Sequence, residues 1–219
     1  MYTYGFCIMD FRLKHNSSLV CIGPSQSGKT TFVRKLLEYR EDDSIFDHAL
    51  GTVHWHYGTY FPDLAYLRDV KGYKLYEGLP QSLEHLKSYD VVVLDDLMVE
   101  AGQSKVVTEL FTRTVHHLPC FLIMLVQNQY YQSKDGKTRQ INTKYLVLFQ
   151  NPRDQGQVAI LARQMYPQNS KFLREVFEDA TKVPFGYLFI DLHQDTPSER
   201  RLRARILPEE APQVVYQMK

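Results

Sequence analysis

The sequence has few of the features that define secreted mini-proteins or membrane proteins. It contains three isolated cysteines among 219 residues and no C-x-x-C spacing, which excludes a disulfide framework or a cysteine metal site as the basis of the fold. No apolar run approaches the roughly 18 residues of a spanning helix, and the first residues lack the basic and apolar regions of a secretory signal. We therefore expect thiols in a reducing compartment, an intracellular setting in nucleus or cytoplasm, and no membrane partner.

Strong charge, repeats and low-complexity segments are also missing. The formal net charge is +1, with a net acidic first half and a net basic second half. A basic half is compatible with contact to a polyanion, although an ordinary solvated surface explains it equally well. Hydrophobic residues make up 44% of the chain, which is enough for one sizeable core. These totals favour one α/β domain, or one domain with appendages, and argue against a disordered chain.

Strand and helix patterns alternate along the chain. We predict helices over 30–39, 105–117, 154–165 and 170–180, and strands over 18–22, 50–57, 91–94, 121–126, 145–149 and 186–191. Such alternation predicts a parallel sheet with right-handed crossovers. We assign residues 1–195 to one domain. The charged, proline-flanked segment 196–219 is predicted to be a basic tail or peripheral helix.

A phosphate-binding motif lies at the first strand-to-helix junction. The pattern G-x-x-x-x-G-K-T occupies residues 23–30 in the context that this motif requires. Its two glycines allow backbone amides to approach a phosphate, and the helix N-terminus adds partial positive charge. Lys29 reaches the β- and γ-phosphates, and the Thr30 hydroxyl ligates Mg²⁺. We predict an ATP–Mg²⁺ site formed by Gly23, Pro24, Ser25, Gln26, Ser27, Gly28, Lys29, Thr30 and Thr31.

Polar residues follow two further buried strands. Asp95 ends the strand at 91–94, where the second protein ligand of a nucleotide-bound Mg²⁺ is needed; a strand cap is the alternative. Asp96 is the predicted base that polarises the attacking water, and Glu100 is the second candidate. Gln127 follows strand 121–126 and is predicted to sense the γ-phosphate or orient water. A glutamine that only satisfies loop backbone is the alternative to that role.

The strand at 50–57 is predicted to lie between the phosphate-loop strand and the Asp95 strand. An inserted strand separates ATPases of the additional-strand (ASCE) class from simple nucleotide kinases and GTPases. The sequence shows neither an N-K-x-D guanine motif nor an arginine-rich kinase lid. We therefore predict an α/β P-loop NTPase fold of the ASCE, RecA-like type, with a mostly parallel sheet and helices on both faces.

Several later segments accompany these motifs in order. Together they resemble the genome-packaging ATPases of the FtsK/HerA superfamily, and most closely those of Polinton (Maverick) elements, adintoviruses and related double-stranded DNA viruses. The resemblance extends from about residue 19 to about residue 208, and its ordered set is more specific than the phosphate loop alone. The segments are GPSQSGKT (23–30), GLP (78–80), VVVLDDLM (91–98), ELFTRTVHH (109–117), VQNQYYQ (126–132), NTKYLVLFQNPRDQ (142–155), LARQMYP (161–167), FEDAT (177–181) and GYLFIDL (186–192).

This resemblance implies that a homo-oligomeric ring, a hexamer or pentamer, uses ATP to translocate double-stranded DNA. It also implies a capsid or portal protein as a further partner and the virion as a further location. It implies that Lys29 and Thr30 hold phosphate and Mg²⁺, and that Gln127 occupies the polar sensor position. Two positions depart from the family pattern. Asp96 replaces the usual Glu, which leaves the identity of the base open, and Val126 stands where Thr often precedes the Gln.

Ring ATPases complete each site with an arginine of the next subunit, which stabilises charge on the phosphoryl group in transfer. Arg113, Arg139, Arg153 and Arg163 are the candidates. We favour Arg139 and Arg153, because both flank strand ends on the phosphate-loop side of the predicted sheet; surface arginines paired with local carboxylates are the alternative. The loop 130–140 and the basic segment 199–205 are candidates for DNA phosphate contacts. A subunit contact is the alternative for the loop, and a solvated helix face is the alternative for the segment.

Two other functions remain open from the sequence. A P-loop kinase acting on a nucleoside-type small molecule would transfer phosphate and would not need a second acidic residue at position 96. A nucleotide-gated assembly factor would bind ATP with little turnover. Hydrolysis stimulated by duplex DNA separates the translocating ATPase from both alternatives.

Overall fold

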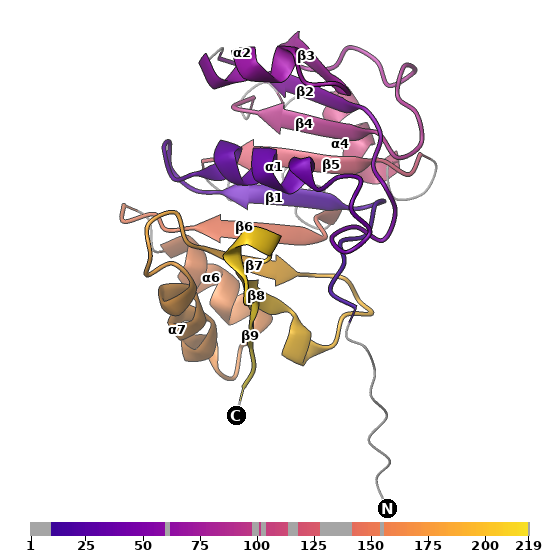
Figure 1. Cartoon of the computed structure of the whole chain (residues 1–219). Helices are drawn as coiled ribbons and strands as arrows, with labels where there is room; N and C mark the ends of the chain where they lie inside the picture. The colour runs from indigo at the N-terminus through magenta and orange to yellow at the C-terminus, as the bar shows by residue number, and fades with distance from the viewer. Residues whose placement is uncertain are drawn as a thin grey trace, which may run out of the picture.

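The computed structural model describes residues 10–59, 62–97, 101, 104–113, 118–127, 142–153 and 156–218. Within these ranges one nine-stranded sheet forms the centre of the molecule, in the order β3-β2-β4-β5-β1-β6-β7-β8-β9 (Figure 1). The first six strands of that order are parallel, and the last three are antiparallel to their neighbours. The strands are β1 (Ser18–Ile22), β2 (Val53–Tyr57), β3 (Tyr73–Glu77), β4 (Val91–Asp95), β5 (Phe121–Val126), β6 (Tyr145–Phe149), β7 (Tyr187–Asp191), β8 (Leu202–Ala204) and β9 (Val214–Tyr216).

Helices cover both faces of the sheet, which confirms the predicted fold class. Among the described residues, two helices share a core with one face, and three pack against the other (Figure 1). None of the helices in the described ranges combines the length and apolarity needed to cross a membrane. The first group is α1 (Lys29–Glu38) and α2 (Pro62–Arg68), and the second is α4 (Lys105–Arg113), α6 (Gly156–Met165) and α7 (Ser170–Ala180).

The central strands are buried on both faces. Phe121, Ile123 and Leu125 of β5 enter the core under α1, whereas Leu122 and Met124 enter the core under α4. This follows from the period of two along a strand, which sends successive side chains to opposite faces. Full burial of such a side chain contributes about 2 kcal/mol. The prediction that the continuous apolar runs form central parallel strands is therefore confirmed.

The prediction for the strand at 50–57 is wrong in its spatial position. β5, not β2, lies between β1 and β4, and β2 pairs with β4 on its other side. Every residue of both strands is buried, so burial alone does not show which of the two lies beside β1. The additional strand between the phosphate loop and the acidic strand is β5, which Gln127 follows.

The C-terminal segment, predicted as a basic tail or a peripheral helix, forms no α-helix within residues 196–218. The segment forms a short 3₁₀ turn (η1, Ser198–Arg200) and then β8 and β9, which extend the sheet. The alternation in β8 accounts for this, because Leu202 and Ala204 enter the core that contains α7 while Arg203 faces the opposite side. Arg203 is 2% exposed, so it does not belong to a solvated basic face.

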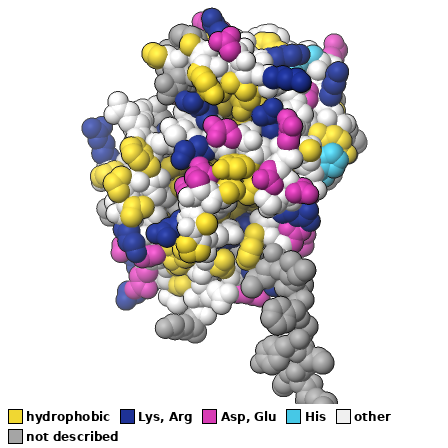
Figure 2. All heavy atoms as spheres, in the orientation of Figure 1, with side chains coloured by type: hydrophobic (Ala, Val, Ile, Leu, Met, Phe, Trp, Pro, Cys, Tyr) yellow, Lys and Arg dark blue, Asp and Glu magenta, His cyan; other side chains and the backbone are white. Residues whose placement is uncertain are grey.

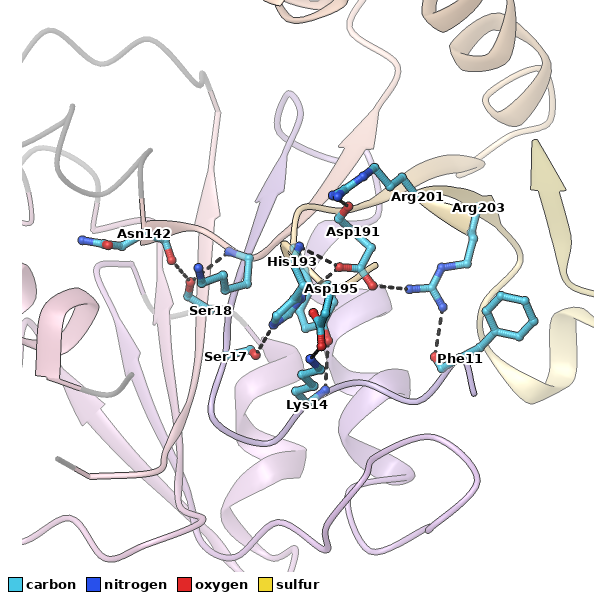
Figure 3. A network of polar contacts seen from close by, with 12 residues as sticks. Phe11, Lys14, Ser17, Ser18, Asn142, Asp191, His193, Asp195, Arg201 and Arg203 are labelled. Atoms are coloured by element: carbon cyan, nitrogen blue, oxygen red, sulfur yellow. Dashed lines mark hydrogen bonds and ion pairs between the residues drawn. The ribbon is translucent and has the colours of Figure 1, made fainter. Parts of the chain in front are cut away.

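A buried polar network joins the last strands to the start of β1, at the sheet edge away from the phosphate loop (Figure 3). The Arg203 guanidinium donates to the Asp191 carboxylate at 3.2 Å and to the Phe11 carbonyl at 2.9 Å. His193 Nδ1 donates to Asp191 at 2.9 Å, and its Nε2 lies 2.9 Å from Ser17 Oγ. The network thereby fixes the N-terminal segment and β8 against β7.

Candidate functional site

The loop between β1 and α1 has the backbone geometry of a phosphate cradle. Gly28 precedes the helix with φ at 99°, in the left-handed region that favours glycine. A Cβ at Gly23 would lie 2.7 Å from the Cβ of Phe149 and 2.8 Å from Ser27 Oγ, so a side chain does not fit there. The strand–loop–helix context predicted for residues 23–30 is therefore present, and the loop leads into the N-terminus of α1.

Lys29 is the first residue of α1, and its side chain folds back onto the preceding loop. Its Nζ donates to the carbonyls of Gly23 and Pro24, each at 2.7 Å. Burial lowers the pKa of Lys29, while the nearby Cys21 and the carboxylates of Asp95 and Asp96 act in the opposite direction. The ammonium group is thus held beside the cradle and within electrostatic reach of the acidic pair.

The ends of β1, β5 and β4 bring the polar residues to one edge of the sheet. All three strands are parallel, and the register pairs Ile22 with Val126 and Leu125 with Asp95. The amide of Gly23 donates to the carbonyl of Val126 at 3.2 Å. Gln127 consequently lies between the phosphate loop and the acidic pair, one strand from each.

Asp95 is a buried carboxylate with an unused oxygen. It is 6% exposed, and within the described part of the chain its Oδ2 has no hydrogen-bond partner. Burial and the charge of Asp96 raise its pKa to about 6, against the opposing effects of Lys29 and of the Trp55 and Thr30 side chains. A buried unpaired carboxylate oxygen beside a threonine hydroxyl is a suitable donor set for Mg²⁺, which prefers hard oxygen ligands. The residues therefore fit the implied metal.

Asp96 lies one position beyond the strand and turns outward. Its φ of 54° places it in the left-handed region, and its side chain is exposed. Gln127 Nε2 donates to Asp96 Oδ1 at 3.4 Å, a weak contact that links two neighbouring strand ends. The second carboxylate of the pair is therefore exposed to solvent, whereas that of Asp95 is buried.

Comparisons with known proteins extend these observations. No protein-family model and no curated protein sequence matches the chain. Solved structures do match. The crystal structure of B204, the DNA-packaging ATPase from Sulfolobus turreted icosahedral virus, superposes with a TM-score of 0.56 at 11% sequence identity, covering 84% of this chain and 96% of that chain. The genome-packaging NTPase B204 of Sulfolobus turreted icosahedral virus 2 superposes with a TM-score of 0.51, in complex with AMP at 11% identity and with AMPPCP at 13%.

These two viral structures cover 82 to 84% of this chain and more than nine-tenths of their own. The strand order, the loop geometry and this similarity agree. The chain has the P-loop NTPase fold. At identities of 11 to 13%, the similarity establishes the fold. It does not establish the roles of individual residues, which are inferred from the geometry of this site.

The P-loop NTPase fold brings together most of the residues predicted for the site. Lys29, Thr30, Asp95, Asp96 and Gln127 lie at the ends of three adjacent strands, as described above. Ser25, Gln26 and Ser27 form the turn of the cradle, and Thr31 is in the first turn of α1. Their roles in binding and catalysis remain predictions.

Two of the predicted residues lie outside the described residues, namely Glu100 and Arg139, as does the loop 130–140. Arg153 is exposed and follows β6, which is parallel to β1, so it lies at the same edge as the phosphate loop. Its backbone amide donates to the Asn151 side chain at 3.1 Å. Arg163 is exposed on α6, and for Arg113 the backbone alone is described. The arginine supplied to a neighbouring subunit stays a prediction.

The sequence did not predict that Phe185 lies beside the phosphate loop of this P-loop NTPase fold. The Phe185 ring lies 3.2 Å from the position that a Cβ on Gly28 would occupy. Phe185 follows a proline in a segment read as a connection before a strand. No local pattern connects position 185 with position 28, because their proximity depends on the pairing of β7 with β6.

Proposed function

We propose that the chain is a Mg²⁺-dependent ATPase that moves double-stranded DNA into a viral capsid as a homo-oligomeric ring. The observation that carries the ATPase proposal is the buried, unpaired Asp95 oxygen beside Thr30, on the strand that only β5 separates from the strand of the amide cradle. The packaging role is supported by the ordered motifs and by the structural similarity to B204, a DNA-packaging ATPase. Complexes of B204 from the second virus with ATPγS and AMPPCP support the choice of ATP.

Each residue of the site has a separate role in the proposed reaction. The cradle amides and Lys29 hold the β- and γ-phosphates, and Thr30 and Asp95 hold Mg²⁺. When bound, that ion neutralises charge that develops on the phosphate oxygens. Asp96 accepts the proton of the attacking water, and Gln127 keeps that carboxylate in position through its amide. Asp is one methylene shorter than the Glu of related ATPases, so the water is expected to lie closer to the backbone of β4.

The neighbouring subunit completes the site in this proposal. An arginine at the phosphate-loop edge, Arg153 or Arg139, stabilises the transferring phosphoryl group across the ring interface. Duplex DNA is contacted through its phosphates, independently of sequence and with sensitivity to salt. On the face drawn in Figure 2, side chains of both charge signs are interspersed, so that face has no single-sign field for a polyanion. The basic loop 130–140 remains the proposed DNA contact, with a capsid or portal protein as a further partner.

The proposal predicts ATP hydrolysis that rises when linear duplex DNA is added. Asp96→Asn should lower kcat by about 10²- to 10⁴-fold, because it removes the base and leaves the phosphate cradle intact. Lys29→Ala should weaken ATP binding itself. Phosphate release measured with and without DNA gives all three results. Asp69→Asn, at an exposed carboxylate after α2, is the matched control and should hydrolyse ATP at the wild-type rate.

The other outcomes of this assay are equally specific. A wild-type chain that is not stimulated by duplex DNA, or an unaffected Asp96→Asn variant, would contradict the translocating ATPase. Phosphate transfer to a nucleoside with no free phosphate released would identify a kinase. ATP binding without turnover, with or without DNA, would identify a nucleotide-gated assembly factor. The mass of the complex with ATP and DNA tests the ring.

A further inference from the structure

A second cavity opens beside the phosphate loop, on the side opposite the acidic pair. Its volume is about 180 Å³, which is room for a group much larger than a water molecule at about 30 Å³. Four aromatic side chains contribute to its walls, and the polar groups are few. It is lined by Gly28, Thr31, Phe32, Lys35, Phe149, Phe185, Tyr187, Leu207 and Glu210.

The cavity follows one flank of α1 from the loop outward. Its residues from α1 and the cap before it are at positions 28, 31, 32 and 35, the spacing of one helix face. Phe149 ends β6 and Tyr187 begins β7, and the two are paired in register. The opposite wall thus comes from the strands next to β1 on the side away from β5. The cavity and the phosphate loop share Gly28 and Thr31, so they are continuous.

The order of the strands sets the direction of a bound molecule. Asp95 and Gln127 end strands on one side of β1, and the aromatic cavity is built from strands on the other side. A ligand whose phosphates occupy the loop and whose terminal phosphate faces Asp95 therefore has its other end directed at this cavity. In a nucleoside triphosphate, that end is the ribose and the base.

Phe185 forms the exposed part of the cavity wall. It is 70% exposed and has φ at 61°, and a hydrogen bond from the Gly186 amide to the Val183 carbonyl at 2.9 Å closes the turn around it. Burial does not explain an aromatic ring in this position, since most of its surface faces solvent. Tyr187, by contrast, is buried, and its hydroxyl donates to Glu210. The rigid wall is therefore Tyr187 with Phe149, and Phe185 is the side that a ligand would cover.

We propose that this cavity binds the nucleobase of the nucleotide, with the Phe185 ring against the face of the base. This inference rests on the proposed function and adds the recognition of the base to it. Stacking of a base on an aromatic ring is tolerant of base identity, because every base has a π-face. The site is accordingly expected to bind GTP within a few-fold of ATP, and to obtain part of its affinity from the ring.

The test compares a nucleotide with a ligand that has phosphates but no base. Binding of Mg²⁺-ATP and of Mg²⁺-tripolyphosphate is measured by calorimetry for the wild type, Phe185→Ala, Phe185→Tyr and Lys29→Ala. Phe185→Ala should weaken ATP binding about tenfold or more and leave tripolyphosphate binding unchanged. Phe185→Tyr should restore ATP binding, and Lys29→Ala should weaken both ligands. Tyr66→Ala, at an aromatic residue on α2 with 64% exposure, is the control and should bind both ligands like the wild type.

The results separate failure of this inference from failure of the proposed function. Wild-type chain that binds neither ligand would overturn the proposed function and this inference with it. Wild type that binds ATP, with equal affinity in Phe185→Ala, would overturn the base site alone. An equal loss of both ligands in Phe185→Ala would also overturn it, because the ring would then act on the phosphate loop. A changed oligomer mass with unchanged ATP affinity would assign Phe185 to a subunit contact instead.

Discussion

At the scale of single residues, the ionisation of Asp95 connects the buried strand to metal binding. Its pKa is raised to about 6 by burial and by the charge of Asp96. A carboxylate must be deprotonated to ligate a cation, so binding of Mg²⁺ at this residue releases a proton when the pH is near 6. The same burial that places Asp95 beside Thr30 therefore makes the site sensitive to mild acid.

Mg²⁺-ATP affinity should consequently fall as the pH is lowered below about 6, by up to tenfold per pH unit for one proton. The sign follows from the raised pKa, since the protonated form is favoured below it and cannot hold the ion. Binding is measured from pH 5 to pH 8. The nucleotide also titrates, so the same series with Asp95→Asn serves as the reference. Identical pH profiles for wild type and Asp95→Asn would show that Asp95 does not ligate the metal.

At the scale of elements, the predictions that rest on local pattern are confirmed. Strands 18–22, 121–126 and 145–149 and helix 170–180 have the predicted bounds. Each has either a continuous buried apolar run or a clear helical face. The phosphate loop and the acidic residue after β4 could also be read from the sequence, because each is a local motif at a strand end.

The elements that were missed have weaker patterns. β3 has intermediate or exposed side chains at an edge, and β8 and β9 contain three residues each. The basic residues of segment 199–205 predict a solvated face or a DNA contact, whereas Arg203 is buried against Asp191. The spatial order of β2 and β5, and the cavity beside Gly28, depend on pairing between distant segments. No local pattern in one sequence specifies such pairing.

The Asp191–Arg203 pair is predicted to hold β8 on the sheet. Burial acts to raise the pKa of Asp191, but the hydrogen bonds from His193 and the charge of Arg203 outweigh it, so the pKa is lowered. Arg203→Met should reduce the free energy of unfolding by about 3 kcal/mol at pH 7, because it leaves a buried carboxylate without this cation. Urea denaturation measures the change. Arg205→Met, at an exposed arginine just after β8, should change it by less than about 0.5 kcal/mol.

The pH dependence of this pair has a defined sign. A carboxyl whose native pKa is lowered contributes stability above its unfolded value of about 4, and that contribution is lost as the pH falls through the native value. The difference in stability between the wild type and Arg203→Met should therefore shrink below about pH 4. A difference that is the same at pH 7 and pH 3, or no difference at pH 7, would contradict an ionised pair.

At the scale of the whole molecule, one sheet edge brings together residues from five strands. β4 supplies the acidic pair, β5 the glutamine, β1 the phosphate loop, and β6 and the start of β7 the aromatic wall. The carboxyl ends of parallel strands meet at a common edge, which is the general position of ligand sites in such sheets. The antiparallel β7 joins this edge through its first residue. The polar network of Figure 3 lies at the opposite edge and stabilises the frame.

The central claim is that the phosphate loop and the acidic strand end form a single Mg²⁺-ATP site. A double-mutant cycle tests it most directly, with Mg²⁺-ATP affinity measured for wild type, Thr30→Val, Asp95→Asn and the double variant. If both residues ligate one ion, the double variant should lose less than the sum of the single losses, with a coupling of about 1 kcal/mol or more. Losses that add within about 0.3 kcal/mol would show that the two residues act independently, and would contradict a shared site.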